Sequence, residues 1–474
     1  MRTMLLTTLV LIIVLLLTSE ATANPTISIG WSEQHGAAEV SAEFISWRNG
    51  QQIVTRNIPD GASLRVALVI PRKSILNVES KAAAIWMQHA LQPVWATRIV
   101  RSGSTYALML LGSEQEAKIP WEMDTCFAEW TRGSTNTALS ITFDTGETVY
   151  TLDRSVLLKS AIRQVQIGAI SFRGDIVFNP NRSNVLTSIN VLKIEDYLRG
   201  VVPNEMPASW PLEALKAQAL AARSYAVRQF GKHRQDGFDL CSTVHCQAFA
   251  GASSEHPQSD RAVAATKGEV ITYGGTIIDA VYHAHSGGHT RNSEYVWGGV
   301  VSYLKGVAIP EEPPYTWTRR ITVLEFERRI RNIAPVLFVL SVNINSYADT
   351  NHVNRLTISS LSGNHTISAQ QLRSAMNAAL MRSTKFDILL YDRYLLPYRA
   401  TSRPELFALE VGRVGGIFHG LLPTQPAFIE FVGRGFGHGV GMSQWGAYGL
   451  ALNGENYQGI VRRFYTGVRL TKAW

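Results

Sequence analysis

One alanine-rich helix constrains the fold of this chain more than any other feature. Ser209 and Pro211 are residue types favoured where a helix begins, and Glu213 would interact favourably with the helix dipole in the first turn. Apolar residues then recur at spacings of three and four, at Leu212, Leu215, Ala219, Ala222 and Ala226. Because many of them are alanine, the sequence predicts a helix whose neighbours approach closely.

Arg223 lies on the edge of this apolar stripe. It projects only about 40° from Ala219, so we expect its side chain to be partly buried and to need an acceptor. Glu205 precedes the helix, between Pro203 and Pro207, where we expect a stiff, non-helical loop. Its carboxylate is the nearest candidate acceptor. From spacing alone, the two residues form either a structural ion pair or part of a functional site.

The remaining periodicity predicts an α+β fold, with mixed sheets around the long helix and a small N-terminal α+β module at residues 24–124. Within this module we expect weak strands at 24–60 and then a β-α-β-β unit. Its elements are expected at Leu64–Ile70, Val78–Leu91, Ala96–Val100 and Tyr106–Leu111. This unit resembles the SPOR modules that bind peptidoglycan, and the alternative is an ordinary accessory domain. The large domain is expected at 125–474.

The first 23 residues predict export. Arg2 precedes an apolar run from Met4 to Leu17, and the small residues Ala21-Thr22-Ala23 follow it. This pattern is typical of a secretory signal peptide, with an uncleaved membrane anchor as the alternative. In both cases the body of the protein lies outside the cytoplasm, secreted or in the cell envelope. The net charge of +8 suits a polyanion, but this location excludes an intracellular nucleic-acid partner.

A zinc site is predicted near the end of the long helix. The chain has three cysteines, too few for a disulfide-built scaffold. Cys241 and Cys246, with the adjacent His245 and the upstream His233, supply the ligand types of a closed zinc site. In an oxidising exterior the alternative is a Cys241–Cys246 disulfide. The predicted role of the metal is to hold the loop in place.

Two further segments carry candidate site residues. Asp279–Ser286 is expected to be a strand with His283 and His285 on one face. From Gly433 to Gly441 glycine occupies every second position, which in a strand would leave one face as bare backbone, open to a substrate or another chain segment. The spacing fits neither a dinucleotide fingerprint nor a nucleophile elbow. Ser443 is expected to cap a following helix.

Several of these segments resemble the stage II sporulation protein D / amidase enhancer B (SpoIID/LytB) family. The matches are Glu195-Asp196-Tyr197-Leu198, Gly200-Val201-Val202, Glu205-Met206-Pro207, Glu213–Ala219, Ala222-Arg223, Tyr282 with Ser286-Gly287-Gly288 and Thr290, Trp297-Gly298, Tyr303-Leu304-Lys305 and Gly437–Ala447. The resemblance implies that Glu205 is the catalytic acid/base. It implies that Tyr303 and Lys305 face the same cleft, and it makes Ser286 and His438 candidate substrate-binding residues. Some family members carry zinc near the cysteine pair.

The resemblance implies a lytic transglycosylase that cleaves the MurNAc–GlcNAc bonds of peptidoglycan and leaves 1,6-anhydro ends. One carboxyl then suffices, whereas a glycoside hydrolase normally uses two. Apolar neighbours such as Met206, Pro207 and Trp210 would raise the pKa of Glu205, and a close Arg223 would lower it. Arg223 is therefore expected to hold a substrate carboxylate or to orient the loop.

Two other functions remain open. The first is a non-catalytic, wall-binding enhancer of an N-acetylmuramoyl-L-alanine amidase. The second is a hydrolase with Glu195 or Asp196 as the second carboxylate.

Overall fold

The computed structural model describes residues 164–180, 186–348, 350–398 and 425–474, together with the strands and a few adjoining residues between 25 and 159. The predicted signal peptide, the predicted helix at 78–91 and Cys126 lie outside the described residues. The described chain combines helices with several sheets, so the predicted α+β class is confirmed. It forms two compact units. Residues 1–205, 229–260 and Trp474 belong to the first unit, and residues 206–228 and 261–473 belong to the second.

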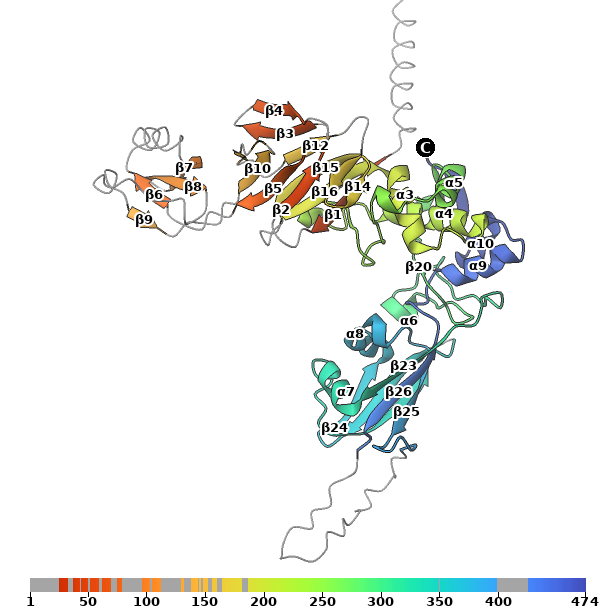
Figure 1. Ribbon diagram of the computed structural model, residues 1–474. Coiled ribbons are helices and arrows are strands. Elements are labelled where there is room, and N and C mark those ends of the chain that lie inside the picture. Colours follow the sequence, from red (N-terminus) through yellow and green to blue (C-terminus); the bar gives the residue numbers. More distant parts are fainter. Residues whose placement is uncertain are drawn as a thin grey trace, which may run out of the picture. The chain divides into compact units, whose positions relative to one another are not determined.

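Two sheets form most of the first unit (Figure 1). The seven-stranded sheet has the order β17 (Leu240–Cys241), β1 (Thr26–Ser32), β16 (Leu186–Lys193), β15 (Asp175–Pro180), β12 (Val156–Lys159), β3 (Phe44–Asn49) and β4 (Gln52–Asn57). The six-stranded sheet has the order β11 (Thr148–Thr151), β10 (Ala138–Phe143), β5 (Leu64–Val69), β2 (Ala37–Ser41), β13 (Val165–Ile167) and β14 (Ile170–Phe172). Trp31 of one sheet meets Phe172 of the other edge to face, with ring centroids 5.8 Å apart.

The strand pairing differs from the expected division at residue 124. β1 pairs with β16 along its whole length, from Thr26 opposite Lys193 to Ser32 opposite Thr187. The first strands of the chain therefore share a sheet with a strand that was assigned to the large domain. Alternation along a strand shows which face is buried, but it does not show which distant strand completes the sheet.

A separate four-stranded sheet is inserted between β5 and β10, which pair with each other. Its order is β7 (Ala96–Ser102), β8 (Thr105–Leu111), β6 (Ile75–Val78) and β9 (Glu129–Thr131). The expected strands at 96–100 and 106–111 are confirmed as the hairpin β7–β8. Their partner is β6, so the β-α-β-β unit that begins at Leu64 is wrong.

The first unit continues from β16 into α3 (Ile194–Glu205), and the second unit is organised around α4 (Leu212–Arg228). The predicted alanine-rich helix is confirmed, but it is buried on nearly all sides rather than along one stripe. It packs against α9 (Gln444–Leu452), α10 (Tyr457–Phe464) and β18 (Glu269–Tyr273), and Figure 1 shows α9 and α10 beside it. β18 lies between β19 (Thr276–Ile277) and β28 (Arg469–Lys472). α5 spans Pro257–Ala265.

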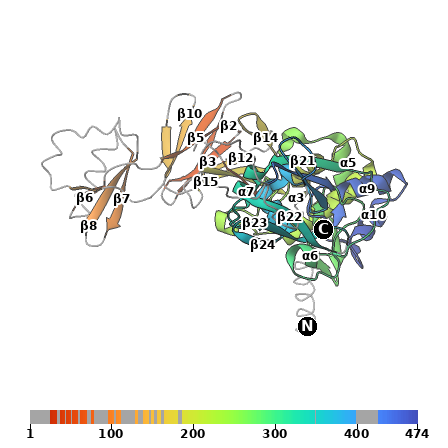
Figure 2. The same ribbon diagram turned by 90° about the horizontal axis from the view of Figure 1, so that it is seen from below.

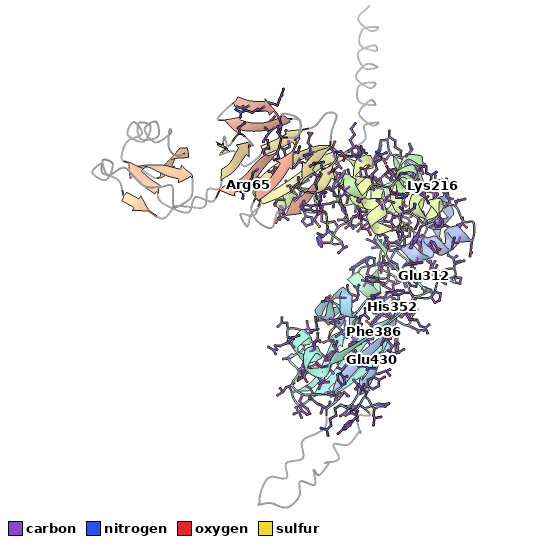
Figure 3. The ribbon with its side chains drawn as sticks, viewed as in Figure 1. Arg65, Lys216, Glu312, His352, Phe386 and Glu430 are labelled. Carbon is purple, nitrogen blue, oxygen red and sulfur yellow. The ribbon has the colours of Figure 1, made fainter. Side chains whose placement is uncertain are left out.

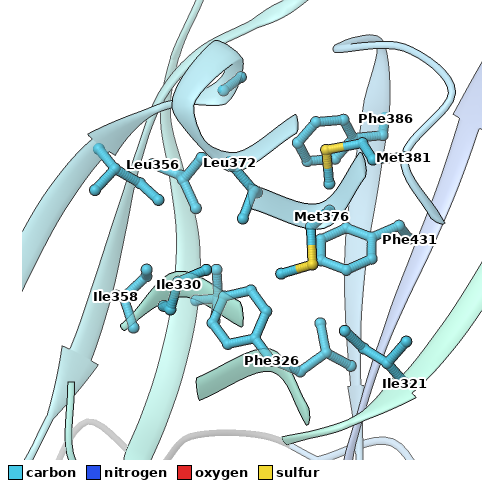
Figure 4. Close-up of a cluster of buried hydrophobic side chains, with 14 of the residues drawn as sticks. Ile321, Phe326, Ile330, Leu356, Ile358, Leu372, Met376, Met381, Phe386 and Phe431 are labelled. Atoms are coloured by element: carbon cyan, nitrogen blue, oxygen red, sulfur yellow. The ribbon is translucent and has the colours of Figure 1, made fainter. Parts of the chain in front are cut away.

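The second unit also includes two further three-stranded sheets. One sheet has the order β21 (Thr316–Thr322), β26 (Phe428–Arg434) and β25 (Phe386–Tyr391), and the other has β22 (Val339–Tyr347), β23 (Val353–Ser360) and β24 (Gly363–Ser368). β21, β22, β23 and β24 of these sheets are labelled in Figure 2 together with α7 (Val323–Ile330). α7 and α8 (Ala369–Leu380) contribute Phe326, Leu372 and Met376 to a shared apolar core, which Figure 4 shows together with Phe431 of β26. In the part of the chain that the structure describes, no helix has the length and hydropathy needed to cross a bilayer.

Candidate functional site

Glu205 is the last residue of α3, so the predicted non-helical loop is wrong at this position. Pro203 lies inside the helix, in its final turn. A proline there removes one backbone hydrogen bond, but α3 is held by its buried face, which includes Tyr197, Leu198 and Val201. Tertiary packing thus overrides local propensity. The Glu205 side chain is half-buried. Because Glu205 is the last residue of a packed helix, the backbone atoms that carry its side chain are held in place.

A segment from Gln247 to Gly251 docks against α3 and contacts Glu205. The backbone amide of Ala248 donates a hydrogen bond of 2.8 Å to Glu205 Oε1. The Tyr197 hydroxyl donates to Gln247 Oε1 at 3.0 Å, and the ring centroids of Tyr197 and Phe249 lie 5.3 Å apart. Gly200 allows this close approach, because a Cβ there would lie 2.6 Å from the Phe249 ring. The segment therefore places one amide donor on the candidate catalytic carboxylate.

The four predicted metal ligands lie together immediately before this segment. The ligand atoms of His233, Cys241, His245 and Cys246 all lie within 4.8 Å of one another. The closest pairs are Cys246 Sγ with His233 Nε2 at 3.5 Å, Cys241 Sγ with His245 Nδ1 at 3.5 Å, and Cys246 Sγ with His245 Nδ1 at 3.7 Å. A tetrahedral zinc ion holds sulfur and nitrogen ligands about 3.3–3.8 Å apart. Both cysteines are free, so the alternative disulfide is not formed in this structure.

Neighbouring groups orient these ligands. His233 Nδ1 lies 3.1 Å from Asp236 Oδ2, which leaves Nε2 directed at Cys246. A carboxylate behind a ligating imidazole is the usual second partner in metal sites. Cys241 belongs to β17, whose pairing with β1 ties one ligand to the seven-stranded sheet. The donor set and its supports fit a structural zinc ion, and Ala248 follows Cys246 by only two residues.

Arg223 is wholly buried within the second unit. Its Nη1 donates to the Glu269 carbonyl at 3.1 Å, and its Nη2 lies 3.4 Å from the Val263 carbonyl and 3.5 Å from the Thr266 hydroxyl. These contacts tie α4 to α5 and to the start of β18. The expected burial and need for acceptors are therefore confirmed. The pair with Glu205 and a role in holding substrate stay predictions.

Ser286 is buried and bonded to a carboxylate that the sequence analysis did not single out. Glu312, labelled in Figure 3, has no exposed side-chain surface. It accepts hydrogen bonds from the Ser286 amide at 2.8 Å, the Ser286 hydroxyl at 2.6 Å, the Gly288 amide at 2.7 Å and the Ser443 hydroxyl. The expected strand around Ser286 is reduced to β20 (Tyr282–His283), which pairs with β27 (Met442–Ser443). Glu312 thus joins two of the motifs, and Ser286 serves to hold it.

Tyr303 and Lys305 lie in the second unit, near different partners. The half-buried Tyr303 accepts a hydrogen bond from the Asp279 amide at 3.2 Å. Lys305 Nζ lies 4.0 Å from a Glu294 carboxylate oxygen, and its side chain is 42% exposed. The Lys305 ammonium therefore forms a long, partly exposed ion pair with Glu294. The prediction that both residues face the cleft of Glu205 stays a prediction.

The glycine-rich segment is a loop rather than the expected strand. β26 ends at Arg434, and Gly435, Gly437, Gly439 and Gly441 all have positive φ. At Gly437 a Cβ would lie 2.7 Å from the Cβ of His283, so the bare backbone accommodates another chain segment. The expected cap is confirmed, since the Ser443 hydroxyl accepts from Gly446 N at the start of α9.

His438 is half-buried between two rings in this loop. Its ring centroid lies 5.4 Å from that of His283 and 5.3 Å from that of Trp297. Its Nδ1 accepts a hydrogen bond from the Val440 amide at 3.1 Å. Burial lowers the pKa of His438 to about 4, with further contributions from the positive charges of Arg373 and Arg291. The imidazole is therefore neutral at physiological pH.

Apolar side chains follow Glu205 directly along the chain. Met206 and Trp210 are buried in the second unit, whereas Pro207 is exposed. The Trp210 ring lies 4.6 Å from Trp445 and 4.8 Å from Tyr448, centroid to centroid. Their effect on the pKa of Glu205 stays a prediction.

The structure brings the predicted sites together as two groups. Glu205 and the four metal ligands lie in the first unit, linked through Ala248. Arg223, Ser286, Tyr303, Lys305 and His438 lie in the second unit. Sequence reasoning missed Ala248, which acts through its backbone, and Glu312, whose partners are distant in sequence.

Comparisons with known proteins point to one family. A family model described as "Stage II sporulation protein" matches residues 182–273. An uncharacterized protein of Brachyspira hyodysenteriae (strain ATCC 49526 / WA1) is 31% identical over 306 residues, which cover 64% of this chain and 73% of that protein. Stage II sporulation protein D of Bacillus amyloliquefaciens is 31% identical over 304 residues, 60% of this chain and 76% of that protein. The amidase enhancer of Bacillus subtilis (strain 168) is 29% identical over 290 residues, 58% of this chain and 40% of that protein.

The matched family model includes α3, Glu205 and the candidate metal-ligand cluster. The chain therefore belongs to the stage II sporulation protein D / amidase enhancer B (SpoIID/LytB) family.

Proposed function

We propose that this protein is an exported peptidoglycan lytic transglycosylase with Glu205 as its acid/base, acting in sporulation or cell-wall remodelling. Glu205 would protonate the oxygen of the MurNAc–GlcNAc linkage and later accept the proton of the sugar's own 6-hydroxyl. The bond broken is the glycosidic C–O bond, and the bond formed closes a 1,6-anhydro ring. The observation that carries the proposal is a half-buried glutamate, fixed at the end of α3 with a backbone amide on Oε1.

The same helix argues against a two-carboxylate hydrolase. Glu195 and Asp196 lie in the first turn of α3 and Glu205 in the last. At a rise of about 1.5 Å per residue, their backbones are separated from that of Glu205 by roughly 13–15 Å. The carboxyl groups of inverting glycosidases lie about 6.5–9.5 Å apart, and those of retaining enzymes lie closer. Glu195 also has its own partner, since it accepts a hydrogen bond from the Trp474 indole at 3.2 Å.

We further propose that His233, Cys241, His245 and Cys246 hold a structural zinc ion. Four protein ligands would close its coordination sphere, as in structural rather than catalytic zinc sites. Its contribution would be mechanical, because the cluster directly precedes the Gln247–Gly251 segment that docks on α3. His233 would be oriented by Asp236, and Ala248 would be delivered to Glu205.

The decisive experiment is digestion of peptide-free glycan strands by the purified protein, followed by mass spectrometry. Fragments with anhydro ends are expected. Glu205→Gln should abolish cleavage, while the matched Glu195→Gln variant should retain it. Fragments with reducing ends, whose formation is lost when Glu195 or Asp196 is replaced as well as when Glu205 is replaced, would establish the hydrolase instead.

A second function is favoured by the similarity to an amidase enhancer. Such a protein would bind wall polymer and stimulate a separate N-acetylmuramoyl-L-alanine amidase without cutting glycan. Intact strands, together with a faster amidase in the presence of both wild-type protein and Glu205→Gln, would replace the enzymatic proposal with this one.

A further inference from the structure

Basic and imidazole side chains gather around the glycine-rich loop of the second unit. Arg373 of α8 donates from Nη2 to the Arg382 carbonyl at 3.2 Å, and the same carbonyl accepts from the Gly437 amide at 2.9 Å. His283 also adjoins Gly437, and its ring lies 5.4 Å from that of His438. Arg373, His283 and His438 therefore border one stretch of backbone.

Several nitrogen atoms in this cluster are buried without a protein partner among the described residues. His283 uses Nδ1 to donate to the Val440 carbonyl at 3.0 Å, which leaves Nε2 unbonded. His352, labelled in Figure 3, uses Nδ1 with the Thr384 hydroxyl at 3.0 Å and also leaves Nε2 unbonded. Arg373 Nε is also buried without a hydrogen-bond partner among the described residues. His283 and His352 are only 5% and 2% exposed. A buried polar group left unmatched costs about 1–3 kcal/mol, so these atoms favour a ligand that bonds to them.

The charge of the cluster is positive. Arg291, Arg373 and Lys385 act electrostatically on the three imidazoles. The nearby carboxylate of Glu312 lies 3.3 Å from His285 and is already held by hydrogen bonds from Ser286 and Gly288. Burial lowers the pKa of His283 and His352 well below the usual value, so the imidazoles are neutral and the arginines carry the charge. Within the described residues, no carboxylate pairs with Arg373 or with Arg382, which instead lies over the Phe436 ring at 5.3 Å. A partly buried guanidinium without an acidic partner favours an anion.

An exposed aromatic ring lies next to His438, the imidazole on which Arg373 acts electrostatically. Trp297, at the end of α6 (Glu294–Trp297), is 52% exposed and its ring lies 5.3 Å from His438. A solvent-facing indole offers an apolar surface and a polar edge. Such a surface suits the C–H face of a sugar ring, and Arg373, which acts on the same imidazole, suits an acidic substituent.

We propose that this site binds a muramoyl sugar through its lactyl carboxylate, with Arg373 pairing with the carboxylate and Trp297 packing against the sugar ring. The substrate class rests on the proposed function. The binding itself needs only residues of the second unit and does not depend on cleavage.

The test measures binding to the full-length Glu205→Gln protein by titration calorimetry, so that strands stay uncut. The probes are peptide-free glycan strands and the same strands with their carboxyl groups reduced to alcohols. Reduction is expected to weaken binding about 10- to 100-fold, the range for a hydrogen bond to a charged group. Arg373→Met should weaken the binding of native strands to the same extent. It should also abolish the difference in affinity between native and reduced strands. Trp297→Ala should weaken the binding of native and reduced strands equally.

The matched control is Arg355→Met, which removes an exposed arginine on β23 of the same unit and should leave both affinities unchanged. If Arg373→Met still distinguishes native from reduced strands, the site is wrong. Displacement of native strands by glycerol phosphate at equal concentration would assign it to a phosphate polymer and overturn the muramoyl assignment. If the variant binds strands through their carboxylates but the wild-type protein does not cleave them, the binding site is supported and only the transglycosylase proposal is refuted. If the wild-type protein cleaves strands but binding does not depend on their carboxylates, the binding site is refuted and the transglycosylase proposal is kept.

Discussion

The backbone amide of Ala248 donates a 2.8 Å hydrogen bond to Oε1 of Glu205, across 43 residues of sequence. The end of α3 carries partial negative charge and disfavours an ionised carboxylate there, whereas this amide favours it. The donor comes from the segment that directly follows the four candidate metal-ligand residues. The position of the candidate acid/base therefore depends on both the helix and the cysteine-containing loop.

Removing that amide should impair catalysis. Ala248→Pro deletes the N–H, and we expect glycan cleavage to fall about 10- to 100-fold, as for loss of a hydrogen bond to a charged group. Ala248→Gly keeps the donor and serves as the matched control. Cleavage rates on peptide-free strands are to be compared at equal melting temperature and equal metal content. A proline variant as active as the glycine variant would show that the amide is dispensable.

Removing the proposed zinc ion should loosen the same segment. We expect about one zinc per chain by elemental analysis, and a lower melting temperature after treatment with a strong chelator, because metal binding contributes directly to folding. Cys246→Ser should lose the metal and most of the cleavage activity, since Ala248 follows two residues later. Cys126→Ser, which removes none of the four candidate ligands, should keep both. Full metal content in Cys246→Ser would refute the ligand assignment.

Glu312 should be a major stabilising residue of the second unit. Replacing its carboxylate by the amide in Glu312→Gln places N–H groups against donors that include the Ser286 hydroxyl and the Gly288 amide. We expect the free energy of unfolding to fall by about 2–4 kcal/mol in urea denaturation. The control Asp387→Asn, at an exposed position on β25 of the same unit, should change it by less than about 0.5 kcal/mol. Equal effects at the two positions would contradict the role given to Glu312.

The buried imidazoles should make stability depend on pH. His438 has a pKa of about 4 in the folded protein, and an unfolded histidine has a pKa of about 6.5. Between these values the unfolded chain binds a proton that the folded chain does not, so stability falls as the pH decreases from about 6.5 to 4, by at most roughly 3 kcal/mol. Melting temperatures across this range should show a shallower decrease for His438→Asn, whose carbonyl can still accept from Val440. As a control, His256→Asn at an exposed position should show the same decrease in melting temperature as the wild type. A steeper or unchanged slope in His438→Asn would reject the assignment.

Local sequence was sufficient for the features that depend on nearest neighbours or on residue type. The start of α4 directly after Pro211 and the cap of α9 at Ser443 were predictable, because helix-start signals involve residues only a few positions apart. The four candidate metal ligands could be chosen from side-chain chemistry alone, since few residue types bind zinc. The β7–β8 hairpin was also predictable, because its two strands are adjacent in sequence.

Other features depend on partners that are distant in the chain. The prolines around Glu205 indicated a loop, but the buried face of α3 stabilises a helix through Pro203, and periodicity does not include that packing energy. The partner of β5 is β10, beyond an inserted sheet, and no local pattern specifies it. Glu312 draws its donors from Ser286, Gly288 and Ser443, and Ala248 acts through an amide that every residue except proline possesses. Side-chain identity therefore determined which residues were candidates for chemistry, and long-range packing determined which backbone and buried polar atoms hold them, because those contacts form only when distant segments meet.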